Sequence, residues 1–352
     1  MSRDPGIELD PARHQVPTDQ RQILCLSGGG FRGLYTALVL EALEQRSQRP
    51  LNDVFDVVAG TSIGGWIAAA LALRIPAAEI RAGIATHAPT IFHRRSTIGH
   101  RRFQIASPLR FLYRPRYAKR PVRQAIDTIF GKHGLTPLSE MRAPLVLSAV
   151  DVATSSPVIL LSGGLAGRHA SNLSLRDALL ATSAAPTYFP VHRVGDRSFV
   201  DGGLVANAPD LVAVTETIRH LGCDLEQVRV LSVGTAGTPH AARIKTKAPG
   251  LVAWLMQHGL VQLTLSAQEQ LVVQQTAVLL RDRYLRLDYT HKGTERLDLQ
   301  LDAVSDASKD ALKRAAEVTI GTFSASNRAA VRRFLSHRSQ GPRRAPLSLN
   351  GH

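Results

Sequence analysis

Short apolar runs alternate with helical patterns along the first two thirds of the chain. Continuous apolar runs of four to six residues predict buried strands, and apolar residues at helical spacing predict helices. The strands expected in this way are residues 22–27, 54–59, 145–150, 158–161, 198–200 and 228–233. The helices expected between them are residues 34–45, 63–72, 175–181 and 211–221.

This alternation predicts the fold class. Strands that are apolar along their whole length are typical of parallel sheets with helices on both faces. We therefore expect an α/β fold of three layers, α/β/α, with a mainly parallel central sheet. From Pro249 onward the pattern is mostly helical, with one strand-like piece at 284–287.

The same pattern suggests a single main domain. We predict a flexible leader at 1–20, an α/β domain at 21–235, a mainly helical C-terminal portion at 236–338 packed on that domain, and a flexible tail at 339–352. The N-terminus is polar, and no apolar run approaches the roughly 20 residues that a membrane span requires. The two cysteines are too few for a disulfide framework. These features indicate a cytoplasmic protein.

Three motifs lie where a predicted strand gives way to a loop, the place where open α/β sheets hold their ligands. The first is the glycine loop, Gly28–Gly33 (GGGFRG). It fits the dinucleotide pattern G-x-G-x-x-G, and Asp53 follows it at nearly the spacing of a ribose-binding acid. That acid should close the second strand, however, whereas Asp53 precedes it. An anion cradle of backbone N–H groups at a helix N-terminus is the better interpretation.

The second motif is Gly60-Thr61-Ser62-Ile63-Gly64, between a strand and a helix that is apolar on every side. A strand, a tight turn with small neighbours and a buried helix are the context of a nucleophile elbow. The positive end of the helix then faces the serine. A serine that merely caps the helix is the alternative, and the context favours Ser62 as a nucleophile.

The third motif is Asp201-Gly202-Gly203, at the end of a short strand. An acid before two glycines is often just a turn. A serine nucleophile needs a base, however, and a carboxylate serves if burial raises its pKa toward neutrality. A Ser–His–Asp triad through His240 or His258 is the alternative, although neither histidine follows a strand.

In this order the three motifs resemble those of the patatin-like phospholipases. The segment 182–190 (TSAAPTYFP) and the tripeptide 207–209 (NAP) extend the resemblance, which runs from about residue 22 to 234. It implies a patatin-like fold in which 21–235 is the catalytic domain, a Ser62–Asp201 dyad without histidine, and release of free fatty acids from membrane phospholipids. The implied oxyanion hole comprises Gly28, Gly29, Gly30, Arg32 and Gly33. The elbow glycines are Gly60 and Gly64, and those of the acid motif are Gly202 and Gly203.

The charge of the chain bears on what it binds. The net charge is +15, and residues 80–126 contain eleven Arg or Lys but no Asp or Glu. Such a surplus attracts polyanions such as a nucleotide or an anionic membrane surface, although a solvated basic face is the simpler explanation. The basic segment at 92–123 is thus a lid, a membrane-binding face or a nucleotide site.

Within the family, the chain is similar to the phospholipase effectors of cyclic-oligonucleotide antiphage signalling (CBASS). The similarity rests on residues 91–95 (IFHRR), 267–272 (AQEQLV) and 282–286 (DRYLR). It implies an enzyme activated by a cyclic dinucleotide such as cGAMP and acting on phospholipid at the inner face of the membrane. The arginines assigned to the nucleotide are Arg94, Arg95, Arg101 and Arg102.

Two other functions stay open. One is a constitutive patatin-like lipase or esterase without nucleotide control. The other is a non-catalytic lipid- or nucleotide-binding protein, which the complete set of serine, acid and glycine loop argues against. No metal site is expected, because no His/Cys/Asp/Glu cluster has ligand spacing. No cofactor besides the activating nucleotide and no DNA or RNA target are expected either. The oligomeric state is left open.

Overall fold

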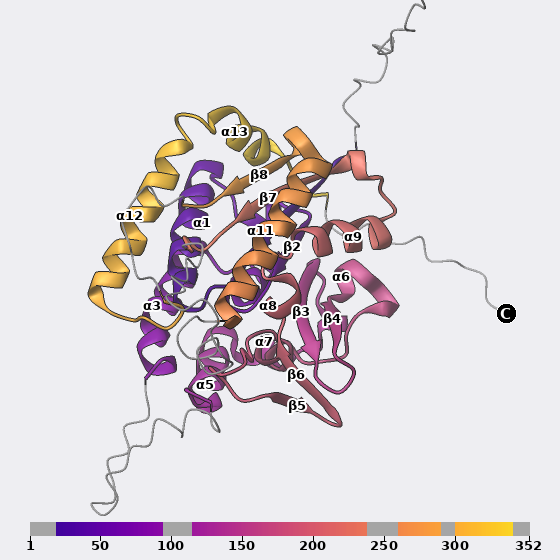
Figure 1. Cartoon of the computed structure of the whole chain (residues 1–352). Coiled ribbons are helices and arrows are strands. Elements are labelled where there is room, and N and C mark those ends of the chain that lie inside the picture. Colours follow the sequence, from indigo (N-terminus) through magenta and orange to yellow (C-terminus); the bar gives the residue numbers. More distant parts are fainter. Residues whose placement is uncertain (1–18, 94–114, 238–259, 290–299, 341–352) are drawn as a thin grey trace, which may run out of the picture.

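A computed structural model describes residues 19–93, 115–237, 260–289 and 300–340. Its centre is an eight-stranded sheet with the order β5-β6-β3-β2-β1-β7-β8, in which β4 pairs with β3 (Figure 1). The strands are β1 Arg21–Leu26, β2 Val57–Gly60, β3 Leu145–Asp151, β4 Ser156–Leu161, β5 His192–Val194, β6 Arg197–Asp201, β7 Val228–Val233 and β8 Tyr284–Leu287.

The middle of the sheet is parallel. Strands β3, β2, β1, β7 and β8 all run in the same direction, whereas β4 and β6 run antiparallel to β3 and β5 runs antiparallel to β6. The predicted α/β class with a mainly parallel sheet is therefore confirmed. Strand β1 shows why it forms, because every residue in it is buried. Leu24 and Leu26 enter one apolar core, while Ile23 and Cys25 enter the other.

Helices cover both faces, as the two cores on opposite sides of β1 require. Seven of the described helices contribute to the larger core: α1 Gly33–Ser47, α2 Ile63–Ala72, α3 Ala77–Ile91, α5 Lys119–Phe130, α7 Leu175–Thr182, α12 Asp306–Thr322 and α13 Arg328–Ser336. The smaller core is built with α6 Gly163–Ala166, α9 Asp210–Leu221 and the end of α11 Leu260–Leu280. The short α8 Gly203–Ala206 lies between β6 and α9 in the chain.

The predicted elements form, with small shifts in their ends. Strand β2 begins only at Val57, because residues 51–53 form a short 3-10 helix. Helices α3 and α5 and strand β5 were not predicted. The C-terminal portion joins the same sheet, since β8 pairs with β7, and α12 packs against α1.

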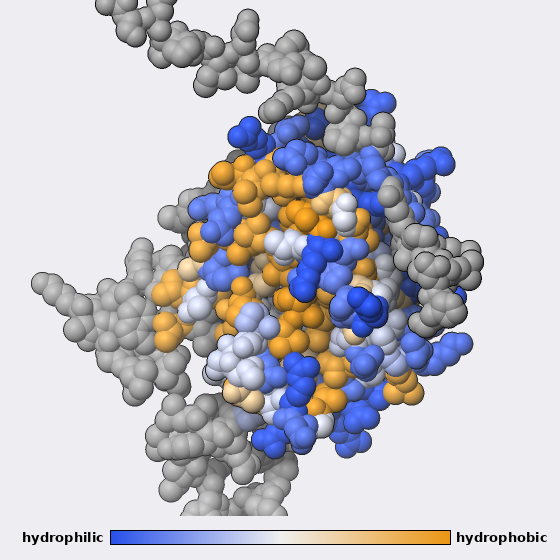
Figure 2. Space-filling model, turned by 90° about the vertical axis from the view of Figure 1, so that its right-hand side faces the viewer, coloured by the Kyte–Doolittle hydropathy of each residue, from blue (hydrophilic) through white to orange (hydrophobic). Residues whose placement is uncertain are grey.

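Helix α11 has no separate apolar and polar faces, because apolar and polar residues are mixed around it, and it is only partly covered. Among its exposed side chains are Leu271 and Val278, which are 54% and 74% exposed. Figure 2 shows one side of the molecule, on which hydrophobic areas lie exposed among hydrophilic side chains. In the described part of the chain, no helix combines the length and apolarity needed to cross a bilayer.

Candidate active site

Strands β2 and β6 meet end to end along one edge of β3. The parallel strand β2 stops with Gly60 opposite Leu147, and the antiparallel strand β6 stops with Asp201 opposite Ala149. The turn that carries Ser62 follows β2 directly. The sheet topology therefore brings Ser62 and Asp201 to the same gap, although they are distant in sequence.

Ser62 occupies the sharp turn that the sequence predicts. Its φ and ψ are 54° and −125°, a conformation that side chains rarely adopt and that costs about 1–3 kcal/mol. Its N–H donates a hydrogen bond to Thr182 Oγ1 at 3.0 Å. The flanking glycines permit the turn: a Cβ on Gly60 would lie 2.2 Å from the Gly64 carbonyl oxygen, and one on Gly64 would lie 2.3 Å from the Leu26 carbonyl oxygen.

Asp201 is a buried carboxyl group beside this serine. The residue is 6% exposed, and its Oδ1 accepts the Gly203 N–H at 2.7 Å. Burial raises the pKa of Asp201 to about 6, while hydrogen bonds from the Gly203 N–H and the Ser62 side chain act in the opposite direction. The chain thus turns at Asp201-Gly202-Gly203, where a Cβ on Gly202 would lie 2.2 Å from the Ser148 carbonyl oxygen. The result is a carboxyl group that titrates close to neutral pH in contact with Ser62.

The glycine loop lies against the serine. A Cβ on Gly28 would lie 3.4 Å from Ser62 Cβ and 2.5 Å from Asn207 Oδ1. Gly30 begins a short 3-10 helix with a φ of +57°, and a Cβ there would lie 2.3 Å from the Leu301 carbonyl oxygen. Glycine is required at Gly30 both by its backbone conformation and by this close approach.

Existing hydrogen bonds reduce the number of N–H groups that can belong to the predicted oxyanion hole. The N–H groups of Gly28, Arg32 and Gly33 donate to backbone carbonyls: Gly28 to Asn207, Arg32 to Gly29, and Gly33 to Gly30 and Phe31. Of the five residues expected in the hole, those whose N–H has no acceptor among the described residues are Gly29 and Gly30. These two N–H groups are therefore the ones available to donate to a bound ligand.

Arg32 points its charge toward the C-terminal portion of the chain. Burial lowers the pKa of its guanidinium group, while the carboxylates of Glu269 and Asp288 act in the opposite direction. Its Nε is buried and has no hydrogen-bond partner among the described residues. A Cβ on Gly237 would lie 2.8 Å from Arg32 Nη1. The Arg32 side chain therefore belongs to the polar network behind the loop, which reaches Glu269.

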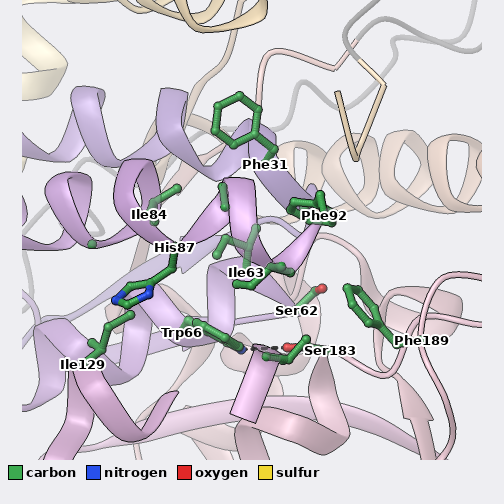
Figure 3. Close-up of a pocket in the computed structure, with 15 residues that line it drawn as sticks. Phe31, Ser62, Ile63, Trp66, Ile84, His87, Phe92, Ile129, Ser183 and Phe189 are labelled. Carbon is green, nitrogen blue, oxygen red and sulfur yellow. Dashed lines mark hydrogen bonds between the residues drawn. The ribbon is translucent and has the colours of Figure 1, made fainter. Parts of the chain in front are cut away.

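A pocket with mostly apolar walls opens at Ser62 between α2, α3 and α5 (Figure 3). Ser62, Phe92 and Phe189 lie toward one end of it, and His87 and Ile129 lie toward the other. Trp66 crosses it and donates from Nε1 to Ser183 Oγ at 2.7 Å. The lining residues are Gly30, Phe31, Ser62, Ile63, Trp66, Gly83, Ile84, His87, Ala88, Ile91, Phe92, Val122, Ile129, Ser183 and Phe189. Such a lining suits a fatty-acyl chain.

Sequence reasoning missed several residues that shape this site. The walls from α3 and α5 went unpredicted, although Ile80, Ile84 and Ala88 are buried at helical spacing, a pattern that could have revealed α3. The hydrogen bonds that support the turn at Ser62 were also not predicted. The Thr61 and Ser148 hydroxyls lie 2.6 Å apart, and the Thr61 hydroxyl donates to the Ala206 carbonyl at 2.6 Å. Hydrogen bonds across a sheet leave no local sequence pattern.

Behind the glycine loop, Asn207 links the catalytic motifs to the C-terminal portion. Its Nδ2 donates to the Gly28 carbonyl at 3.3 Å and to Glu269 Oε2 at 2.7 Å. Glu269 Oε1 in turn lies 2.7 Å from Arg286 Nη2. The segments 267–272 and 282–286 of the sequence therefore meet each other behind the glycine loop.

Other predicted residues lie outside the described part of the chain. These are Arg94, Arg95, Arg101 and Arg102 of the basic segment, and His240 and His258 of the alternative triad. Within the described ranges, no group of three or more His, Cys, Asp or Glu side chains is placed to hold a metal ion.

A serine in a strained strand–turn–helix, a buried carboxyl group beside it and an apolar pocket at its hydroxyl define a serine acyl hydrolase of lipids. Comparison with known proteins specifies the family: the model of the patatin-like phospholipases matches residues 24–214, and the chain belongs to this family.

Its relatives include two bacterial enzymes named cGAMP-activated phospholipase. The one from Pseudomonas aeruginosa is 33% identical over 85% of this chain and 86% of its own length. The one from Escherichia coli is 31% identical over 82% of this chain and 85% of its own length. Among solved structures, human GIVD cytosolic phospholipase A2 matches with a TM-score of 0.41 and 12% identity, covering 91% of this chain and 59% of that one.

Proposed function

We propose that this chain releases fatty acids from membrane phospholipids through a Ser62–Asp201 dyad. The Ser62 hydroxyl adds to the ester carbonyl while Asp201 accepts its proton, and the intermediate expels the lysophospholipid alcohol, which takes that proton back. Water, deprotonated by Asp201, then attacks the acyl–serine ester. The intermediate expels the Ser62 oxygen, which takes the proton back from Asp201, and the fatty acid is released. The N–H groups of Gly29 and Gly30 are the donors to the oxyanion in both steps.

The observation that carries this proposal is the environment of Asp201. Its buried carboxyl group, with a pKa of about 6 and in contact with Ser62, is ionised at neutral pH and still basic enough to accept a proton. A positioned general base contributes about 10²–10⁴-fold to the rate. One oxyanion donor contributes about 3–4 kcal/mol. Loss of either Ser62 or Asp201 is therefore expected to leave almost no activity.

We infer further that a cyclic dinucleotide activates the enzyme. Three relatives at 29–33% identity carry the name cGAMP-activated phospholipase. The segments 267–272 and 282–286, on which the sequence resemblance to such effectors rests, also form the Glu269–Arg286 pair behind the glycine loop. The nucleotide is assigned to Arg94, Arg95, Arg101 and Arg102, because clustered arginines bind phosphate well. The enzyme would then act peripherally at the inner face of the membrane in antiphage defence.

The test is hydrolysis by the full chain of vesicles made of phosphatidylethanolamine and phosphatidylglycerol. Free fatty acid and lysophospholipid are measured by mass spectrometry, with no nucleotide and with a panel of cyclic di- and trinucleotides that includes cGAMP. We expect little release without nucleotide and at least a tenfold increase with cGAMP. Full activity without any nucleotide would instead establish the constitutive lipase or esterase.

Variants test the dyad itself. Ser62→Ala must abolish release, and a Ser62→Ala protein that still released fatty acid would overturn the mechanism. His240→Ala and His258→Ala should retain activity under the dyad. If either of them lost all activity, a histidine triad would replace it.

A further inference from the structure

The part of the acyl pocket remote from Ser62 contains a glycine that no backbone requirement explains. Gly83 lines the pocket from within α3. We propose that Gly83, together with Ile129 on α5, sets the length of acyl chain that the enzyme accepts. This inference rests on the proposed function and identifies the residues that decide its chain-length specificity.

One face of α3 forms a wall that runs away from the serine. Phe92, directly after α3, lies near Ser62, whereas His87 lies well away from it beside Ile129 (Figure 3). Gly83 precedes His87 by four residues and so shares its face of the helix. With a rise of about 1.5 Å per residue, Gly83 lies about 12 Å along α3 from Ile91, the last residue of the helix before Phe92. It therefore borders the deep part of the pocket.

Glycine at this position weakens the helix. In a helix interior it is less stable than alanine, because it loses more conformational freedom on folding. Nothing around Gly83 compensates for that weakness: a Cβ would meet Ile129 Cδ1 at 3.6 Å and Ile129 Cγ1 at 3.7 Å, which are ordinary contacts, and its φ is not positive. What the missing side chain leaves is room in the pocket.

Ile129 is the residue that faces this room from α5. Because the two side-chain positions are in van der Waals range, a larger residue at Gly83 fills the space and a smaller residue at Ile129 extends it. The two positions should therefore compensate each other, as residues that share one cavity do. If Gly83 and Ile129 did not set the acyl length, a smaller residue at Ile129 would not restore activity lost through a larger residue at Gly83.

The experiment compares wild type, Gly83→Ala, Gly83→Val, Ile129→Ala and the double variant Gly83→Val/Ile129→Ala. Hydrolysis of p-nitrophenyl esters from butyrate to palmitate is measured in the presence of cGAMP. We expect Gly83→Val to hydrolyse butyrate within twofold of wild type and to lose at least about 10–200-fold in kcat/KM on palmitate, because one methylene in an apolar pocket already controls that range and valine adds three carbon atoms. The double variant should regain most of the palmitate activity.

The matched control is Gly321→Ala. Gly321 also lies in a helix, α12, but a Cβ there would have nothing within 4 Å. Both Gly83→Ala and Gly321→Ala should raise the unfolding midpoint, and only Gly83→Ala should shift the ester profile toward shorter chains. If Gly83→Val kept the wild-type ratio of palmitate to butyrate hydrolysis, the proposal would be overturned.

A second measurement does not depend on catalysis. The thermal shift of Ser62→Ala protein is recorded with free fatty acids of increasing length, and again after Gly83→Val is added. We expect the longest fatty acid that stabilises the protein to become shorter in the double variant. An unchanged length dependence would refute the role of Gly83, whereas a failure of the proposed function would appear as wild type that hydrolyses no ester at all.

Discussion

At the scale of single residues, Asp201 is held in an environment that suits catalysis and opposes folding. Burial disfavours its carboxylate and raises its pKa to about 6. The same burial keeps it within reach of Ser62, whose own backbone is strained at a φ of 54°. Both residues therefore destabilise the folded protein, as residues at active sites commonly do.

The raised pKa of Asp201 predicts an acidic limb in the pH–rate profile. Asp201 accepts a proton only as the carboxylate, so kcat/KM on a soluble ester should fall about tenfold for each pH unit below about 6. Measurement of kcat/KM between pH 4.5 and 9 tests this. A rate that stayed constant down to pH 4.5 would show that Asp201 is not the base.

Asp201→Asn should abolish activity and stabilise the fold. The folded-state pKa of about 6 lies above the unfolded value of 3.8, so the ionised carboxylate is a destabilising group above pH 6. Each pKa unit corresponds to about 1.4 kcal/mol, so at pH 8 the variant should gain on the order of 3 kcal/mol in the free energy of unfolding. The gain should disappear as the pH falls from 6 to below 3.8, where both states of the wild type are protonated. Denaturant unfolding at pH 8 and at pH 4 measures the difference, and an equal gain at both pH values would contradict it.

At the scale of elements, a short segment from the C-terminal portion shapes the glycine loop. The Leu301 carbonyl accepts the Phe31 N–H at 2.8 Å and packs over Gly30. The neighbouring Asp302 is 5% exposed and accepts hydrogen bonds at 2.6 Å from Arg116 Nη1 and from the Tyr117 hydroxyl. Residues on three parts of the chain are thus joined next to the predicted oxyanion donors.

Asp302→Asn should therefore slow catalysis without weakening substrate binding. The change removes the ion pair with Arg116 and keeps the shape of the side chain, so Leu301 should support Gly30 less well. We expect kcat on a soluble ester to fall about tenfold, which corresponds to about 1.4 kcal/mol and is close to the lower end of the roughly 1.5–3 kcal/mol of a hydrogen bond to a charged group, while KM stays within twofold.

Tyr117→Phe is the matched variant for this prediction. It removes one hydrogen bond to Asp302 and leaves the ion pair, so it should give a smaller loss in kcat. If Asp302→Asn raised KM and left kcat unchanged, Asp302 would belong to substrate binding and would not position the loop.

At the scale of the whole molecule, a largely buried ionic network joins the C-terminal portion to the sheet, and the side chains of Arg286, Glu269 and Asp288 in it are 15%, 19% and 27% exposed. Arg286 on β8 lies 2.7 Å from Glu269 on α11 and 2.8 Å from Asp288. It also donates to the hydroxyl groups of Ser27 and Ser232 at 2.9 and 2.8 Å. Burial lowers the pKa of Arg286, but the surrounding carboxylates, Asp288 first, outweigh it and raise the pKa overall.

Arg286→Met should destabilise the protein by about 3–5 kcal/mol, because it leaves carboxylates buried without their cation. The loss should be smaller at pH 5 than at pH 8. Burial already raises the pKa of Asp288 and of Asp210, and without Arg286 these groups protonate more readily as the pH falls. Denaturant unfolding at both pH values provides the measurement.

The control for this prediction is Arg74→Met. Arg74 pairs with Asp53 at the surface, with the two side chains 56% and 40% exposed. Exposed pairs of this kind contribute about 0–1 kcal/mol. Equal losses for the two variants would mean that the buried network has no special role in joining the C-terminal portion.

The sequence by itself determined the fold class and the elements that carry the motifs. Strands such as Arg21–Leu26 and Val228–Val233 are mostly apolar and buried along their whole length, and a motif such as Gly60–Gly64 is a local pattern of a strand end, a turn and a helix start. The prediction missed one helix in the region where a surplus of basic residues and an apolar helical pattern overlap. The basic residues of 80–126 overlap α5 and mask its helical pattern, in which the buried residues are Val122, Ala125, Ile126 and Phe130.

Only the tertiary structure decided which groups meet and which remain available. The ends of β2 and β6 converge because both strands pair with β3, and the burial that raises the pKa of Asp201 exists only after that pairing. The N–H groups of Gly29 and Gly30 are distinguished from those of their neighbours by hydrogen bonds to Asn207 and within the loop. Gly83 and Ile129 likewise meet only where α3 packs against α5. Such contacts join residues far apart in the chain, so no local pattern encodes them.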